Sequence, residues 1–174
     1  MALKLTPKVP PAEKVPPAER VQAAYKQLSL TATTLNSASD DLGAAMSVLD
    51  AALQRLNLGI TAWVTLSGNE DHDGEWWSRE IGYTKVGDKW GIALKTASGN
   101  YGCPDQDSVE KWLFNDAPRW MRIEATGKIP DLLEALIRHA EDTTKKIQDR
   151  TADVLELAAA MSKVFEEAQP AEQK

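Results

Sequence analysis

The spacing of apolar side chains predicts a long helix toward each end of the chain. In residues 18–57 an apolar row recurs every seven residues, and residues 129–169 contain a similar row. The first row is Leu28, Leu35, Leu42, Leu49 and Leu56, and the second is Leu133, Ala140, Ile147, Val154, Met161 and Ala168. At the helical rise of 1.5 Å per residue, each helix would be about 60 Å long. Helices of this length usually pack in coiled coils.

Residues 58–128 follow a different pattern and contain all six tryptophans of the chain. Residues 60–67 alternate between aliphatic and mostly polar side chains, which is typical of a strand. Two further strands are expected near 78–86 and 89–96, joined by the two-residue turn Gly87-Asp88. This turn sets the register, and it places Tyr83 opposite Ile92 and Glu80 opposite Lys95. We therefore expect an antiparallel meander of about three strands.

The rest of this region gives weaker signals. Residues 108–114 resemble a short helix, because Asp107 could cap its first turn and Glu110 follows three residues later. Residues 118–125 fit either a strand or a helix, and the proline at their start favours the helix.

These elements together predict an α+β fold, in which two antiparallel coiled-coil helices form a hairpin and a small β-meander head is inserted between them. The chain would comprise a proline-rich arm (1–17), a helix (18–57), a Trp-rich head (58–128), a second helix (129–169) and a tail (170–174). The arm repeats the sequence KVPPAE and contains a PxxP spacing at residues 7–10. Either a docking peptide or a semi-rigid lead-in to the helix accounts for it.

Composition and charge narrow the expected partners. The 174 residues have a formal net charge of −6 and contain no basic run, which argues against sequence-independent binding of nucleic acid. No stretch approaches the ~20 apolar residues of a membrane span. With one cysteine, no internal disulfide can form, and no apolar leader is present. We expect a cytoplasmic protein that binds neither nucleic acid nor membrane.

One segment has the spacing of a calcium-binding loop. Asn69, Asp71 and Asp73 alternate, Gly74 follows, and Glu80 stands where such loops place their bidentate carboxylate. Asparagine at the first position lacks the usual charge, and the flanking residues predict strands instead of helices. A polar hairpin loop that binds no metal explains the same residues. No other cofactor is expected.

The tryptophans are the second candidate site. Trp and Tyr are enriched at protein interfaces, so Trp63, Trp76, Trp77 and Trp90 could contact a partner protein. A small head also needs large side chains for its core, and most of the tryptophans could serve there. Trp76 and Trp77 are adjacent, and neighbours on a strand point to opposite faces, so one of the two should be exposed.

Catalytic residue types do not form a recognisable pattern. Cys103 is distant in sequence from both histidines, His72 and His139, and no phosphate-binding glycine loop is present. We therefore expect a non-catalytic interaction or scaffold protein.

Few charges lie between Gln27 and Leu49, which predicts self-association into a homodimer or larger homo-oligomer. The alternatives are a monomer with a solvated Ser/Thr face, and a ligand- or calcium-binding regulatory module, or an enzyme, with its site near residues 69–80.

Overall fold

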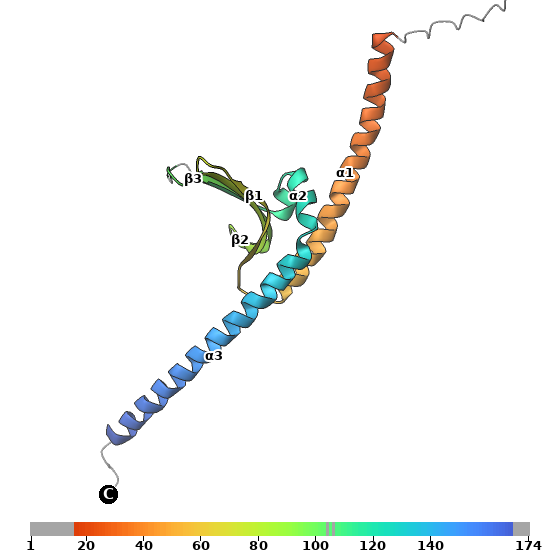
Figure 1. Ribbon diagram of the computed structural model, residues 1–174. Coiled ribbons are helices and arrows are strands. Elements are labelled where there is room, and N and C mark those ends of the chain that lie inside the picture. Colours follow the sequence, from red (N-terminus) through yellow and green to blue (C-terminus); the bar gives the residue numbers. More distant parts are fainter. Residues whose placement is uncertain (1–15, 104, 106, 169–174) are drawn as a thin grey trace, which may run out of the picture. The chain divides into compact units, whose positions relative to one another are not determined.

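The computed structural model describes residues 16–103, 105 and 107–168, with side chains up to residue 165 (Figure 1). Within these residues the fold is α+β, with three α-helices and a four-stranded antiparallel sheet. The elements are α1 (Pro17–Arg55), β1 (Ala62–Glu70), β2 (Glu75–Val86), β3 (Lys89–Asn100), β4 (Ser108–Leu113), the short 3-10 helix η2 (Phe114–Asp116), α2 (Arg119–Thr126) and α3 (Ile129–Ala168). Most of the predicted arm, and the predicted tail, lie outside the described residues.

The sheet has the order β1-β2-β3-β4, so each strand pairs with its neighbour in sequence. Between β2 and β3 the predicted register is confirmed: Tyr83 pairs with Ile92 and Glu80 with Lys95. The reason is the two-residue turn, in which Gly87 adopts a φ of 59° that a residue with a side chain rarely adopts.

The predicted strand count is wrong. Residues 108–113 form β4, an edge strand, and not the short helix expected from a cap at Asp107. Pairing with β3 explains the difference, because it places Trp112 against Leu94, which is fully buried. Such tertiary contacts outweigh a local capping signal. The expectation of a helix at 118–125 is confirmed by α2.

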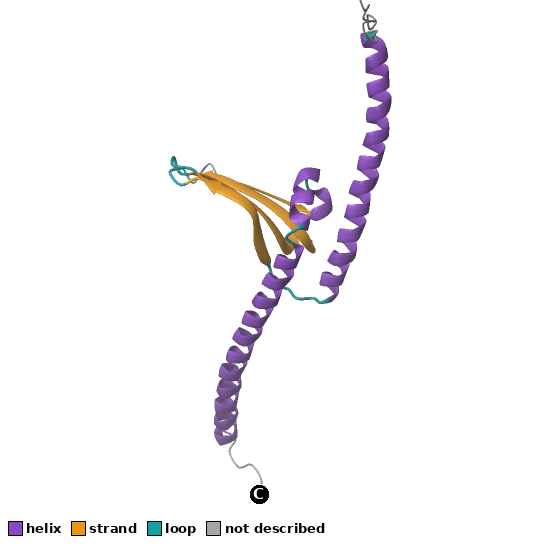
Figure 2. Ribbon diagram, turned by 45° about the vertical axis from the view of Figure 1, so that its right-hand side comes forward, coloured by secondary structure: helices purple, strands orange, loops and turns teal. Residues whose placement is uncertain are grey.

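The core lies between one face of the sheet and the helices. Ile81 and Leu94 on the sheet are fully buried, as are Met121 of α2 and Leu132 of α3. Figure 2 shows α2 and the first turns of α3 beside this face of the sheet. We call it the helix-covered face. Along β2 it presents Trp77, Arg79, Ile81 and Tyr83, because alternate residues of a strand share a face.

The chain divides into two units, Met1–Leu42 and Gly43–Lys174. The described residues of the first unit are helical from Pro17 on. The second unit begins with the last turns of α1, where Met46 and Leu53 are buried. Asn115 of η2 contacts these turns. Its Nδ2 donates one hydrogen bond to the carbonyl of Gly43 (3.2 Å) and another to Oγ of Ser47 (3.0 Å).

Both long helices extend over nearly the predicted residues, at Pro17–Arg55 and Ile129–Ala168. Leu28 and Leu35 in the heptad row of α1 are exposed, as are Ile147, Val154 and Met161 in that of α3. The coiled-coil hairpin therefore stays a prediction. None of the described helices is both long and apolar enough to span a lipid bilayer.

Candidate functional site

The face of the sheet turned away from α2 and α3 carries a tryptophan surrounded by charge. Trp63 of β1 pairs with Gly82 of β2, and its ring lies over the position where a side chain at Gly82 would project. Lys95 of β3 and Lys111 of β4 hold their ammonium nitrogens 4.7 and 5.9 Å from the centroid of this ring. Both distances allow cation–π attraction. We call these residues, with Glu80, the tryptophan–lysine face.

Positive charge exceeds negative charge at the centre of this face. Lys95 and Lys111 are direct cross-strand partners, an arrangement that repulsion makes unfavourable. Glu80 pairs with Lys95, at 2.7 Å between the carboxylate oxygen and Nζ, which confirms the cross-strand contact expected from the register. One carboxylate therefore accompanies two ammonium groups around Trp63.

The helix-covered face has an aromatic cluster of its own where the helices leave it accessible. The guanidinium of Arg79 lies between two indole rings, 4.6 Å from the centroid of Trp77 and 4.5 Å from that of Trp120 in α2. Glu124 accepts a hydrogen bond from Ser67 (2.7 Å) and lies 3.6 Å from Arg79. Trp77 is 39% exposed and Trp120 is 50% exposed. Tryptophan and arginine are both enriched among the hot-spot residues of protein interfaces.

The adjacent tryptophans point in opposite directions, as the strand pattern predicts. Trp77 joins the Arg79 cluster, whereas Trp76 lies on the other face and packs near Tyr101, with 6.3 Å between ring centroids. Trp77 is the more exposed of the two.

We expect Trp77→Ala to lower the free energy of unfolding by about 1–3 kcal/mol, because the residue is only 39% exposed and loses its buried ring surface together with its contact with Arg79. Urea denaturation measures this loss. Trp120→Ala is the matched variant, since it removes the ring on the other side of the same guanidinium. A loss above about 3 kcal/mol for Trp77→Ala would place its ring in the core.

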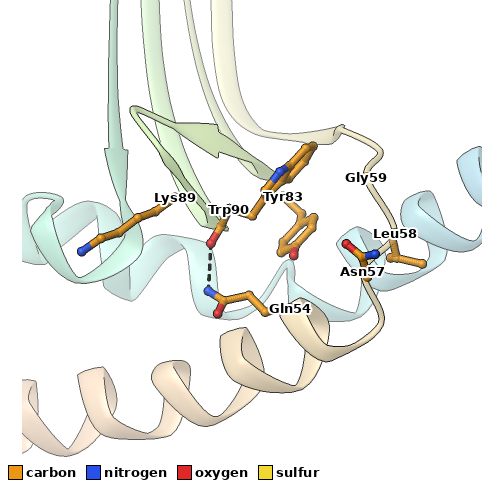
Figure 3. A pocket seen from close by; sticks show the side chains of 7 residues that line it. All are labelled: Gln54, Asn57, Leu58, Gly59, Tyr83, Lys89 and Trp90. Atoms are coloured by element: carbon orange, nitrogen blue, oxygen red, sulfur yellow. Dashed lines mark hydrogen bonds between the residues drawn. The ribbon is translucent and has the colours of Figure 1, made fainter.

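A hollow of about 290 Å³ lies where α1 ends beside the β2–β3 hairpin (Figure 3). Tyr83 and Trp90 stack along it, with ring centroids 5.6 Å apart. Gln54 of α1 donates a hydrogen bond from Nε2 to the carbonyl of Trp90 (2.8 Å). Asn57, with a φ of 47°, lies in the turn that follows the helix. Trp90, predicted as a partner-binding residue, thus lines a crevice between helix and sheet, away from Trp63 and Trp77.

An aspartate of α1 hydrogen-bonds to the backbone of β3 at Ile92, just beyond the last residue of β3 that pairs with β4. Oδ1 of Asp50 accepts a hydrogen bond from the buried backbone N–H of Ile92 (2.8 Å), and Oδ2 accepts one from Gln54 (3.1 Å). Burial raises the pKa of the Asp50 carboxyl, although these hydrogen bonds oppose the shift. Burial, followed by the nearby negative charge of Asp50, also raises the pKa of the Tyr83 hydroxyl.

We expect Asp50→Ala to lower the free energy of unfolding by about 1–2 kcal/mol near neutral pH, because the N–H of Ile92 loses its acceptor. The folded state holds the Asp50 proton more tightly than the unfolded chain does, so this group's contribution falls as pH rises from about 4 through the raised pKa. The difference between wild type and variant should therefore be larger in acid. Denaturation at several pH values tests this. Asp41→Ala, which removes an exposed carboxylate of the same helix, serves as the control.

The predicted calcium loop is a tight turn between β1 and β2. Oδ1 of Asp71 accepts hydrogen bonds from the backbone N–H groups of Asp73 and Glu75, both at 3.0 Å. Asn69 pairs with Trp77 at the end of β1, and Glu80 lies further along β2 in its ion pair with Lys95. Among the described residues, no three His, Cys, Asp or Glu side chains gather as a metal site would require. Calcium binding stays a prediction without structural support.

Two residues of possible catalytic type lie at the same end of the sheet, where the N–H of Tyr101 donates a hydrogen bond to the carbonyl of Gly74 (3.1 Å). Cys103 is exposed after β3, and His72 is exposed in the turn beside Asp71. His139 lies on α3, where its Nδ1 is 3.0 Å from the carbonyl oxygen of Thr61. His139 is thus on another element, and the described residues show no hydrogen bond from the cysteine to either histidine.

Comparison with models of protein families, with curated proteins and with solved structures finds no match. Function must therefore be argued from this chain's own residues.

Sequence reasoning missed Arg79, Lys111 and Asp50 as members of these clusters. A signal existed for Arg79, since residues two apart on a strand share a face and Trp77 was already a candidate. The sequence gives no such signal for Lys111, because its role depends on the formation of β4. It gives none for Asp50, because its role depends on the packing of α1 against the sheet.

Proposed function

We propose that this protein is a non-catalytic interaction or scaffold protein. Its long helices bury their apolar rows by self-association, as a homodimer or larger homo-oligomer, and its Trp-rich sheet contacts another protein. The coiled-coil pairing of α1 with α3 belongs to this proposal, because each helix has an apolar row that the other could cover.

The main support is the apolar surface of the C-terminal half of α3. Ile147, Val154, Met161 and Phe165 are between 61% and 67% exposed. Leu155, Leu157 and Val164 flank this row, so apolar side chains cover about half of the helix circumference. We call these seven residues the α3 apolar stripe. A stripe of this width is typical of a helix that contacts more than one other helix, as in a four-helix bundle.

The first unit supports the same interpretation. Its helix has exposed Val21, Tyr25, Leu28, Leu30 and Leu35. Residues 27–39 of this helix have no charged side chain. An isolated helix that exposes this much apolar surface gains little stability in water, since most helical stability in proteins comes from packing.

The head supports a partner-binding role through its two clusters. Exposed Trp77 and Trp120 hold Arg79 on one face, and Trp63 lies between two lysines on the other. Exposed tryptophan and arginine are enriched at protein interfaces, so the cluster around Arg79 is the stronger support of the two.

Size-exclusion chromatography with light scattering tests the self-association. We expect a mass that is a multiple of the 19.1 kDa chain and that falls on dilution. A mass of 19.1 kDa at about 50 µM would contradict the proposal, because chains that associate through such stripes are expected to do so well below that concentration.

A further inference from the structure

The outer edge of β4 has backbone groups that face away from the sheet. In β3, the N–H of Ile92 and the carbonyl of Trp90 bond to α1, so the even-numbered residues of β3 direct their backbone groups away from β2. Further along the strand the same side faces β4, where Leu94 pairs with Trp112. The backbone groups of Val109 and Lys111 therefore point outward, since backbone groups alternate in direction along a strand. An edge of this kind can pair with another strand.

The two residues with outward backbone groups have their side chains on the tryptophan–lysine face, whereas Glu110 between them points to the helix-covered face. Val109 and Lys111 share a face with Lys95, because the strand pairs set Ala97 opposite Val109 and Lys95 opposite Lys111. Val109 is exposed, and so is Lys111. With Glu80 already in contact with Lys95, the ammonium of Lys111 would gain most from a carboxylate supplied by a partner strand.

Charge disfavours a second copy of β4 as that partner strand. In an antiparallel pair of identical strands, residues of the same face stand opposite each other. Centring such a pair on β4 would place Lys111 of one copy against Lys111 of the other, or Glu110 against Glu110. Like charges in direct opposition destabilise a strand pair. A register centred on Val109 avoids both contacts, but it pairs only residues 108–110 of β4 with their copies. A longer strand pair along this edge therefore favours a strand from a different protein.

We propose that an extended, acidic segment of a partner protein binds along β4 as a fifth strand of the sheet. Its backbone bonds to Val109 and Lys111, and a carboxylate of the segment contacts Lys111. This inference rests on the proposed interaction role of the head, and it specifies the chemistry of the partner.

A short synthetic peptide tests the proposal on the full-length chain. The probe is a fluorescein-labelled peptide of about seven residues that alternates threonine and glutamate, a length suited to the strand. Fluorescence anisotropy should show binding that weakens with salt. The same peptide with glutamine in place of glutamate should bind at least about fivefold more weakly, because it offers no carboxylate to Lys111.

Two variants separate the backbone contribution from the charge contribution. Val109→Pro removes an outward N–H while leaving the ladder between β3 and β4 intact, since proline is tolerated on the solvent side of an edge strand. Lys111→Glu reverses the charge, and each variant should weaken binding about fivefold to tenfold. Lys85→Glu makes the same charge change on β2 next to the hairpin turn and should bind like wild type. Unfolding curves of all variants show whether each has folded.

Equal binding of the glutamate and glutamine peptides would overturn the proposal, as would folded Val109→Pro and Lys111→Glu variants that bind like wild type. Absence of binding to the glutamate peptide would also overturn it. Light scattering on the same samples keeps this outcome distinct from the proposed self-association, because the mass of the assembly should be the same in wild type and Lys111→Glu.

Discussion

A double variant of α3, Val154→Glu with Met161→Glu, is expected to reduce the assembly to a single chain of 19.1 kDa. Both residues belong to the α3 apolar stripe, and both would be covered in a bundle. Each glutamate would then have to lose its water without a partner, which costs several kcal/mol in an apolar interface. We expect the dissociation constant to rise by at least about 100-fold. Light scattering over a range of concentrations measures it.

Ala152→Glu with Ala159→Glu is the matched control. These positions carry the same spacing of seven and the same new charges, but they lie outside the α3 apolar stripe. The control should keep the mass of wild type. If both double variants associate equally well, the stripe is not the interface. If both dissociate, the added charge and not its position is the cause.

Gly82→Ala is expected to lower the free energy of unfolding by about 1–3 kcal/mol, the usual cost of overpacking. A β-carbon at this position would lie 2.6 Å from the carbonyl oxygen of Ala62 and would collide with the Trp63 ring. The ring could move aside, but the backbone oxygen belongs to β1 and cannot do so without bending that strand. Urea denaturation gives the free energy, and near-ultraviolet circular dichroism reports the environment of Trp63.

Gly127→Ala provides the control for this substitution. Gly127 has a φ of −66° and ψ of −15°, and an added β-carbon would have no atom within 4 Å. Alanine there should be neutral, or stabilising by up to about 1 kcal/mol, because it restricts the unfolded chain. A Gly82→Ala variant as stable as wild type would show that Trp63 does not lie against Gly82. The tryptophan–lysine face would then need revision.

The sheet shows which parts of the fold local sequence determines. The β2–β3 register could be predicted residue by residue, since a two-residue turn leaves little freedom in pairing. β4 could not, because residues 108–113 contain a capping signal, and their strand conformation depends on pairing with β3. The first and last residues of α1 and α3 could be predicted to within two positions from the apolar rows that repeat every seven residues. The pairing of these two helices in a coiled-coil hairpin stays a prediction.

The candidate site was predictable in its residue type but not in its arrangement. Trp63 and Trp77 were identified from composition, and the opposite directions of Trp76 and Trp77 followed from strand geometry. Strand geometry also places Arg79 on the face of Trp77, but it does not predict the contact of Arg79 with Trp120 of α2, and Lys111 comes from the strand that was missed. Contacts between elements distant in sequence require the tertiary fold, which no local pattern encodes.

The hydrogen bonds of Asp50 and Gln54 have a consequence for how the second unit opens. A strand edge is normally completed by another strand, whereas here two side chains one helical turn apart serve the N–H of Ile92 and the carbonyl of Trp90. The last turns of α1 cannot detach without exposing both backbone groups in a largely buried stretch of β3. Helix end and sheet therefore melt as one cooperative unit, although they lie on opposite sides of the turn at residues 56–61.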